Sequence, residues 1–329
     1  MMRHKTIVIL TMLLAICFLF PLPAHASLDA VVRITARVPA QARTAASLGT
    51  EREGNGIVID REGRVLTIGY LILEAERIEV TTADGKVYPA RFVGYDHGTG
   101  FGILQTTPPL PGPPIALGDS NAVAAGDAVQ VLTAGELAGI SARVLMRKEF
   151  VGYWEYLLED AIYVAPVHPD YGGAALVAED GRLIGVGSIL TRLEMDEVGW
   201  IACNMFVPID LLKPILAQLI EKGQAAGPAK PWLGLQSSEV QGRVFVTRVS
   251  EDGPAAAAGL ASGDVILSVN GKPVTGQADF YRKVWAVGTA GAKIPLRVLQ
   301  KDQVQEIVVQ STDRRQYLQP AGKIIGEPI

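Results

Sequence analysis

The chain has 329 residues, of which 49% are hydrophobic and 19% charged, and its formal net charge is −4. This length suggests two or three domains, and the apolar content is enough to give each domain a sizeable core. The weakly acidic balance and the lack of a run rich in lysine and arginine argue against a nucleic-acid partner and against steering toward an anionic membrane.

The N-terminus has the three parts of a secretory signal peptide. A basic start at residues 3–5 is followed by an apolar run at residues 7–20 and by the small-residue cleavage motif Ala24-His25-Ala26. We therefore expect residues 1–26 to be removed by a cut after Ala26, and the mature protein to be periplasmic or secreted. An uncleaved anchor is the alternative, but the apolar run is short for a membrane span, which needs about 20 residues.

Cysteine usage excludes a disulfide within the mature chain. Of the two cysteines, Cys17 belongs to the signal peptide, and Cys203 then stands alone. An apolar-flanked cysteine is usually a buried small residue, so we do not expect Cys203 to act as a nucleophile.

Residues 27–222 are predicted to be mainly β. Residues 56–67, 78–93 and 176–186 each show two short apolar strands around a turn in which glycine follows an acidic residue. Many short strands joined by such turns indicate β-barrels or β-sandwiches.

A proline-rich run divides this region. Residues 108–114 contain five prolines, which cannot lie inside a ladder of backbone hydrogen bonds. We expect this run to connect two β-barrels, of which the second spans about residues 115–207.

A helix is predicted at residues 208–222, where apolar side chains recur every three or four positions. Pro208 suits its first turn and Gly223 suits its C-terminal cap. Pro214 is expected to kink the helix or to mark a late start, because proline lacks the backbone N–H group. Residues 223–231 are predicted to be a linker.

Residues 232–311 resemble a bacterial PDZ domain. They contain P-A-x-x-A-G-L at residues 254–260 and G-D-V-I-L-x-V-N-G at residues 263–271. Around these motifs we expect strands at residues 244–249, 294–299 and 305–309 and a helix at residues 277–287. Residues 312–329 are predicted to form a mobile tail.

Three segments before the PDZ-like region resemble the motifs that carry the catalytic triad in HtrA/Deg-type serine proteases. Residues 65–71 (VLTIGYL) resemble V-L-T-N-N-H-V, residues 96–104 (DHGTGFGIL) resemble D-x-x-T-D-L-A-L-L, and residues 169–177 (PDYGGAALV) resemble P-G-N-S-G-G-P-L-V. In that family the motifs supply the general base, the carboxylate that orients it, and the nucleophile. Here the three positions are held by Tyr70, Gly100 and Gly172, or by Tyr171 if the register slips by one.

The resemblance covers residues 54–311 and includes further matches at residues 54–60, 117–120 and 126–129. It implies a mainly β fold, with a chymotrypsin-like double β-barrel followed by a C-terminal PDZ domain.

Without the triad side chains, the chain is expected not to be an enzyme. A serine hydroxyl attacks only after an imidazole takes its proton, and a carboxylate must orient that imidazole. The ordinary pKa of tyrosine is about 10, so Tyr70 would be a poor base at neutral pH, and Gly100 and Gly172 offer no side chain. Asp170, in the turn that forms the oxyanion hole, would oppose negative charge there. Phe206 either narrows the primary specificity pocket or packs inside the barrel.

Two rebuilt sites are the alternatives in this region. The groups available for a metal such as zinc are Asp96, His97, His168 and Asp170. Both histidines are expected to border the old cleft, where Ser188 or Ser141 could be recruited to a Ser–His pair. We expect neither site, and we expect no metal and no cofactor.

The PDZ-like region carries the clearest remaining activity. By resemblance, it takes a peptide C-terminus as an added β-strand, and a loop of backbone N–H groups, Trp232-Leu233-Gly234-Leu235, holds the terminal carboxylate. Gly234 would allow close approach of the backbone. The pocket for the last side chain is expected to be lined by Leu233, Leu235, Phe280 and Val284. A PDZ fold used only for internal docking or assembly is the alternative.

These features lead to the hypothesis of a non-catalytic HtrA/Deg-like protein that binds peptide C-termini or unfolded proteins, as an adaptor, chaperone or decoy in protein quality control. The resemblance implies a homo-oligomer, commonly a trimer, or a hetero-oligomer with active relatives. The alternatives are an active serine-type endopeptidase and a structural scaffold that binds no peptide.

Overall fold

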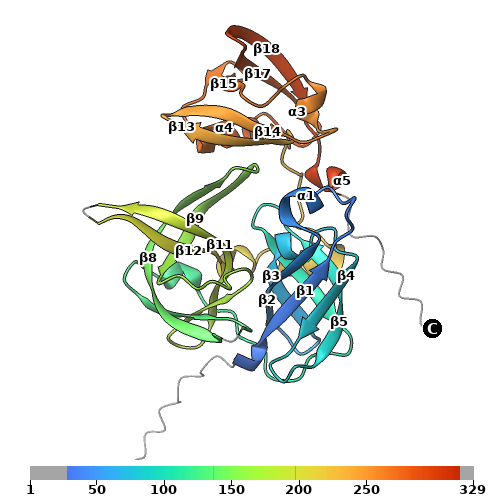
Figure 1. The fold of residues 1–329 in the computed structure, drawn as a ribbon, viewed down its shortest axis with the longest axis vertical. Coiled ribbons are helices and arrows are strands. Elements are labelled where there is room, and N and C mark those ends of the chain that lie inside the picture. Colours follow the sequence, from blue (N-terminus) through green and yellow to red (C-terminus); the bar gives the residue numbers. More distant parts are fainter. Residues whose placement is uncertain (1–27, 136, 197, 319–329) are drawn as a thin grey trace, which may run out of the picture.

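The computed structural model describes residues 28–135, 137–196 and 198–318, and the predicted signal peptide lies outside these ranges. Two closed β-barrels lie below a third unit that contains a mixed arrangement of strands and short helices (Figure 1). Among the helices of the described residues, none has the length and apolar character needed to cross a membrane.

The first barrel has six antiparallel strands in the order β1-β2-β3-β6-β5-β4. In β1, Val32, Ile34 and Ala36 are buried while Arg33 and Arg37 face outward, as expected for a strand with one face toward a core. The strands are β1 Val31–Arg37, β2 Glu51–Val58, β3 Arg64–Ile68, β4 Arg77–Thr81, β5 Val87–Tyr95 and β6 Phe101–Thr106. The short helices are η1 Leu28–Ala30, α1 Ala45–Leu48 and η2 Gly69–Leu71.

The second barrel repeats this design in the order β10-β11-β12-β9-β8-β7. The proline-rich residues 108–114 lie between the last strand of the first barrel and the first strand of the second, as predicted. The strands are β7 Ala128–Leu132, β8 Gly139–Gly152, β9 Tyr156–Ala165, β10 Ala175–Ala178, β11 Leu183–Met195 and β12 Gly199–Pro208. The short helices are η3 Ser120–Ala122 and η4 Ile209–Leu211.

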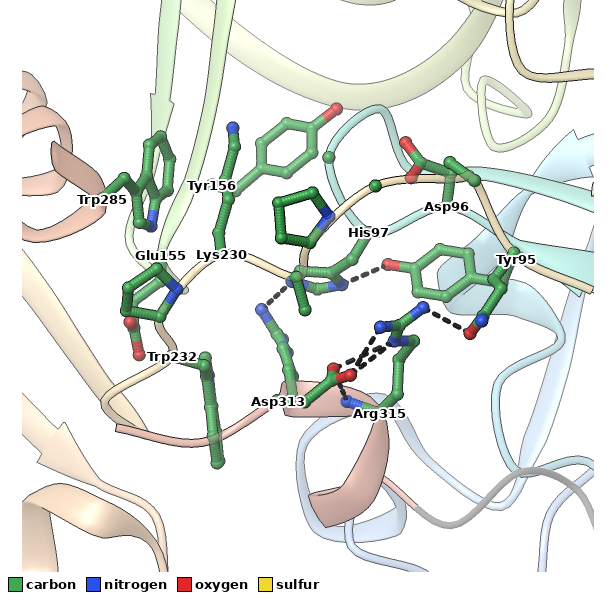
Figure 2. Close-up of a pocket in the computed structure, with 18 of the residues that line it drawn as sticks. Tyr95, Asp96, His97, Glu155, Tyr156, Lys230, Trp232, Trp285, Asp313 and Arg315 are labelled. Atoms are coloured by element: carbon green, nitrogen blue, oxygen red, sulfur yellow. Dashed lines mark hydrogen bonds and ion pairs between the residues drawn. The ribbon is translucent and has the colours of Figure 1, made fainter. Parts of the chain in front are cut away.

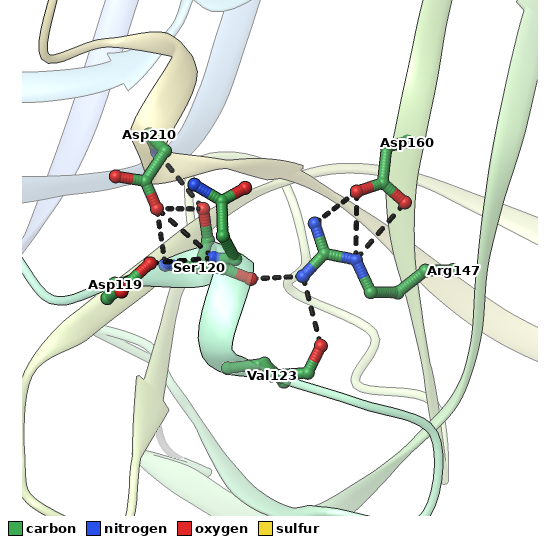
Figure 3. A network of polar contacts seen from close by, with 7 residues as sticks. Asp119, Ser120, Val123, Arg147, Asp160 and Asp210 are labelled. Atoms are coloured by element: carbon green, nitrogen blue, oxygen red, sulfur yellow. Dashed lines mark hydrogen bonds and ion pairs between the residues drawn. The ribbon is translucent and has the colours of Figure 1, made fainter.

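A polar network joins the beginning and the end of the second barrel (Figure 3). The carboxylate of Asp210 accepts hydrogen bonds from the backbone N–H (2.6 Å) and the hydroxyl (2.7 Å) of Ser120. The guanidinium of Arg147 donates to the carbonyl of Val123 (3.0 Å) and pairs with the carboxylate of Asp160. The barrel is thereby closed by charged hydrogen bonds as well as by its core.

The predicted helix at residues 208–222 is wrong in its first half. Pro208 is the extended last residue of β12, η4 is a single 3₁₀ turn, and the α-helix α2 begins only at Leu216 and ends at Lys222. Pro214 lies in the break, so the late start is the alternative that the structure adopts. Gly223 caps the helix with a φ of 73° and donates its N–H to the carbonyl of Leu219 (3.0 Å), as predicted.

The third unit is the predicted PDZ domain, and it has a sheet of order β13-β14-β15-β17-β18 with β16 paired to β15. Strand β13 is one of the two edge strands of this order, and it lies next to helix α4. The strands are β13 Leu235–Val240, β14 Arg243–Val249, β15 Val265–Val269, β16 Lys272–Pro273, β17 Lys293–Gln300 and β18 Gln303–Gln310. The helices are α3 Pro254–Ala257 and α4 Gln277–Ala286.

The start of the predicted mobile tail is folded, which corrects that prediction for residues 312–318. Thr312 pairs with Trp232 through two backbone hydrogen bonds, and residues Arg314–Tyr317 form helix α5. The Tyr317 ring lies 4.6 Å from the Trp232 ring and 4.0 Å from the guanidinium carbon of Arg43 in the first barrel. This segment therefore fastens the PDZ domain to the first barrel, while residues 319–329 lie outside the described residues.

Candidate functional site

Two of the three triad positions meet in the cleft between the barrels. A Cβ atom built on Gly172 would lie 2.8 Å from the hydroxyl oxygen of Tyr70. The buried guanidinium of Arg52 holds the segment that carries this tyrosine, because it donates to the carbonyls of Tyr70 (2.8 Å) and Leu73 (2.9 Å). The fold thus brings positions 70 and 172 together, and these two positions hold a tyrosine and a glycine rather than a histidine and a serine.

Gly100 is near this pair but oriented differently. Its carbonyl accepts a hydrogen bond from the N–H of Gly69 (2.7 Å). A Cβ atom on Gly100 would face Ile68 Cδ1 (3.2 Å) and the Tyr156 hydroxyl (3.4 Å). The φ of Gly100 is +82°, in the left-handed region that favours glycine. A carboxylate introduced here would be strained and would not face Tyr70.

Tyr70 fills the cleft as a hydrogen-bond donor. Its hydroxyl donates to the carbonyl of Ser188 at 2.7 Å. Burial, reinforced by neighbouring Tyr171, raises the pKa of Tyr70 far above its ordinary value of 10.0. The phenol therefore stays protonated near neutral pH and cannot take a proton from a nucleophile.

The turn at residues 170–172 is fastened by Asn55. The side-chain amide of this buried residue donates to the carbonyls of Asp170 (2.7 Å) and Gly172 (3.0 Å). Its side-chain oxygen accepts from the N–H of Ala134 (2.8 Å). The N–H of Asp170 donates to Nδ1 of His168 at 3.1 Å, so this amide of the oxyanion-hole turn is already hydrogen-bonded. A cavity of about 260 Å³ remains beside Tyr70 and this turn.

The two histidines do not share a site, which corrects the expectation that both border the cleft. Nε2 of His168 lies 2.9 Å from the carbonyl of Leu137, whereas His97 lies between the first barrel and the PDZ domain. No cluster of three or more potential metal ligands occurs among the described residues. Both ring nitrogens of each histidine contact groups other than serine, so neither imidazole is available to Ser188 or to the exposed Ser141 on β8.

Phe206 and Cys203 belong to the barrel interior. Phe206 is fully buried in a cluster with Leu176 and Ile184, so the packing interpretation is confirmed rather than a role as pocket wall. Cys203 is also fully buried, and burial raises the pKa of its thiol to about 11, which leaves it protonated and unreactive.

The predicted carboxylate-binding loop of the PDZ domain has the expected shape. Gly234 has a φ of +77°, and the N–H groups of Leu233, Gly234 and Leu235 all donate to the same carboxylate group. The N–H of Trp232 is not part of this set, because it donates to the carbonyl of Thr312 at 3.0 Å. Phe280 and Val284 of α4 are buried in the same apolar cluster as Leu233 and Leu235.

The three N–H groups bind a carboxylate of the same chain. This is the side chain of Glu155, which lies at the end of the β8–β9 hairpin of the second barrel. Sequence reasoning missed Glu155, because an acidic residue in a turn is a weak signal and its partner is about 80 residues away along the chain.

A second cavity lies beside this contact (Figure 2). It has a volume of about 190 Å³ and is lined by residues of both barrels, of the linker and of the PDZ domain. His97 contacts the hydroxyl of Tyr95 (2.9 Å) and the guanidinium of Arg314 in α5. The ammonium group of Lys230 lies 4.0 Å from the centre of the Trp285 ring.

Comparisons with known proteins agree with this architecture. Residues 54–186 match the trypsin-like peptidase domain family, and residues 231–310 match the PDZ domain family. A probable periplasmic serine endoprotease DegP-like protein of Pseudomonas putida (strain W619) is 30% identical over 275 residues, which is 78% of this chain and 55% of that protein. Periplasmic serine endoprotease DegP of Salmonella typhimurium (strain LT2) is 27% identical over 271 residues, covering 75% of this chain and 54% of that protein.

The chain spans about half the length of the curated relatives it matches. Among solved structures, that of the HtrA-type protease AlgW with a decapeptide superposes with a TM-score of 0.52, covering 87% of this chain and 96% of that one at 23% sequence identity. This likeness concerns the fold. Together, the two matched domains and their arrangement place the chain in the HtrA/Deg-type family of trypsin-like domains joined to a PDZ domain.

Proposed function

We propose that this protein is a non-catalytic member of the family that binds peptide C-termini or unfolded chains through its PDZ domain. One observation carries the non-catalytic part: the hydroxyl of Tyr70 lies 2.8 Å from the Cβ position of Gly172, where the family's base and nucleophile would meet. A protonated phenol facing a glycine offers neither a base nor a nucleophile.

The binding part is supported by the PDZ loop. Its three convergent N–H groups already hold a carboxylate, which is the group at a peptide's C-terminus. The HtrA-type protease AlgW, which has the same fold, carries a decapeptide in its structure. The names of the relatives support a periplasmic location for this protein, where it would act as an adaptor, chaperone or decoy, as a homo-oligomer or with active relatives.

The test is catalysis by the purified chain from residue 27 to residue 329. We expect no cleavage of unfolded casein and no labelling by a fluorophosphonate probe. Labelling of a serine in the barrels that disappears when that serine is replaced would establish the alternative, an active serine endopeptidase, which the names of the relatives favour.

A further inference from the structure

The peptide-binding groove of the PDZ domain is filled by a segment of the second barrel. The turn of the β8–β9 hairpin, residues 153–155, reaches the edge strand β13 and the loop before it (Figure 1). We propose that this hairpin is an internal ligand, in which the Glu155 side chain substitutes for a peptide's terminal carboxylate, and that a peptide tail binds only after the hairpin leaves. This inference rests on the proposed function, and it adds how binding is controlled.

The contacts of the Glu155 carboxylate follow the pattern expected for a C-terminus. One oxygen accepts from the N–H groups of Gly234 (2.8 Å) and Leu235 (3.1 Å), and the other accepts from the N–H of Leu233 (2.9 Å). Glu155 is 5% exposed. Three backbone donors on one enclosed carboxylate leave no room for a second carboxylate in the same loop.

The backbone of the hairpin also uses the groove. The N–H of Ser237 on β13 donates to the carbonyl of Tyr153 (2.9 Å), as an added strand would require. From α4, the buried hydroxyl of Tyr281 donates to the carbonyl of Gly152 (2.9 Å) and accepts from the N–H of Glu155 (3.3 Å). Both walls of the groove therefore hold the hairpin turn.

An apolar side chain from the same hairpin enters the PDZ core. Leu157 is 8% exposed and is grouped with Leu233, Leu235, Phe280 and Val284, the residues predicted to line the pocket for a peptide's last side chain. An internal carboxylate thus occupies the loop, and a leucine of the same hairpin belongs to the apolar cluster that contains the expected pocket residues.

The backbone at Glu155 favours glycine, yet the chain has glutamate there. The hairpin has a three-residue turn, and its last residue, Glu155, has a φ of +56°, in the left-handed region. This position of such a turn commonly carries glycine. The energetic cost of this backbone conformation needs compensation. The three hydrogen bonds that the PDZ loop donates to the Glu155 carboxylate provide it.

Two features make the docked hairpin displaceable. Burial raises the pKa of Glu155 despite the three N–H donors and nearby Arg314, so enclosing the ionised side chain carries a cost. Around the turn, the exposed guanidinium of Arg282 pairs with Glu149 and Glu159. Exposed ion pairs contribute little, so a peptide that makes the same central bonds can compete.

The first measurement is hydrogen exchange of the amides of residues 233–235 in the full mature chain. We compare the unaltered protein with Glu155→Ala, with Glu155→Gln, which keeps the side-chain size, and with Glu194→Gln, an exposed charge change on β11. Exchange should accelerate in Glu155→Ala, less in Glu155→Gln, and not in Glu194→Gln. Unchanged protection in Glu155→Ala would overturn the internal ligand.

The second measurement is peptide affinity. A decapeptide library with its last three residues randomised is selected on Glu155→Ala, and the best binder is titrated calorimetrically as free acid and as amide. Because the hairpin lowers the fraction of open groove, the free acid should bind Glu155→Ala at least about tenfold more tightly than the unaltered protein or Glu194→Gln. The amide should bind weakly to all of them.

Different results would contradict the internal ligand and the proposed peptide binding. Equal affinity of the free acid for the unaltered protein and Glu155→Ala would overturn the internal ligand and leave peptide binding intact. Faster amide exchange in Glu155→Ala without selection of any free-acid peptide would support the internal ligand but reject the proposed peptide-binding function, so that the groove would serve docking alone.

Discussion

The cleft between the barrels and the groove of the PDZ domain are both occupied by the chain itself, but in different ways. In the cleft, Tyr70 lies against Gly172 and Asn55 lies beneath the turn, and a cavity of about 260 Å³ remains beside them. The groove keeps its binding elements, the three N–H groups and the apolar lining, and is occupied by a hairpin from another domain.

Under the two proposals made above, this difference separates a lost activity from a controlled one. Side chains that a catalytic site lacks cannot be restored by motion, whereas a hairpin that leaves a groove would expose the binding groups beneath it. Changes in the cleft should therefore alter the stability of the barrels, and changes at the hairpin should alter access to the groove.

The largest effect is expected for Asn55→Ala. This change leaves the part-buried N–H of Ala134 and the carbonyl of Asp170 without their side-chain partner, and it removes one of the two donors to the carbonyl of Gly172, so the free energy of unfolding should fall by about 3 kcal/mol. Urea unfolding of the mature chain measures it, with the exposed Asn121→Ala as the control. If Asn55→Ala and Asn121→Ala have the same free energy of unfolding, Asn55 does not stabilise the turn in the cleft.

A smaller effect is expected for Tyr70→Phe. The change removes the hydroxyl that donates to the carbonyl of Ser188 at 2.7 Å and keeps the ring, so stability should fall by about 1 kcal/mol. Tyr88→Phe on β5 is the matched control. Neither change should alter amide exchange in residues 233–235, and a change there with Tyr70→Phe would contradict the separation of the two sites.

Much of the fold could be predicted from local patterns. The proline run between the barrels, the αL cap at Gly223 and the PDZ motifs depend on neighbouring residues, and the structure agrees with each. The predicted helix at residues 208–222 failed because periodicity alone did not fix where β12 ends.

The contents of the two sites were less predictable. The motifs located Tyr70, Gly172 and the loop at Gly234, because each lies in a recognisable segment. They gave no information about Glu155 or about α5, whose partners lie far away in the sequence. Contacts between domains leave little trace in a single sequence, and here they decide whether the groove is open.

The smallest effect concerns pH and the contact between the first barrel and α5. A guanidinium only donates, so Arg314 must donate to Nε2 of His97, and the proton on Nδ1 then faces the hydroxyl of Tyr95. Burial, followed by Arg314, Lys230 and Arg315, lowers the pKa of His97 well below 6.5, although the carboxylates of Asp96 and Asp313 line the same space.

Because the pKa of His97 is lower in the folded state, the unfolded state binds a proton first as the pH falls. The contribution of neutral His97 to the free energy of unfolding is therefore present above pH 6.5 and is lost as the pH falls below this value. At pH 6 the loss should be about 0.8 kcal/mol. Urea unfolding at pH 7.5 and pH 6.0 measures it in the unaltered protein and in His97→Gln, which keeps an acceptor but does not titrate. The variant should lose less stability than the unaltered protein between these pH values, and an equal loss in both would show that His97 is not the titrating group. Because α5 fastens the PDZ domain beside the groove, such a loss would also loosen the frame on which the hairpin docks.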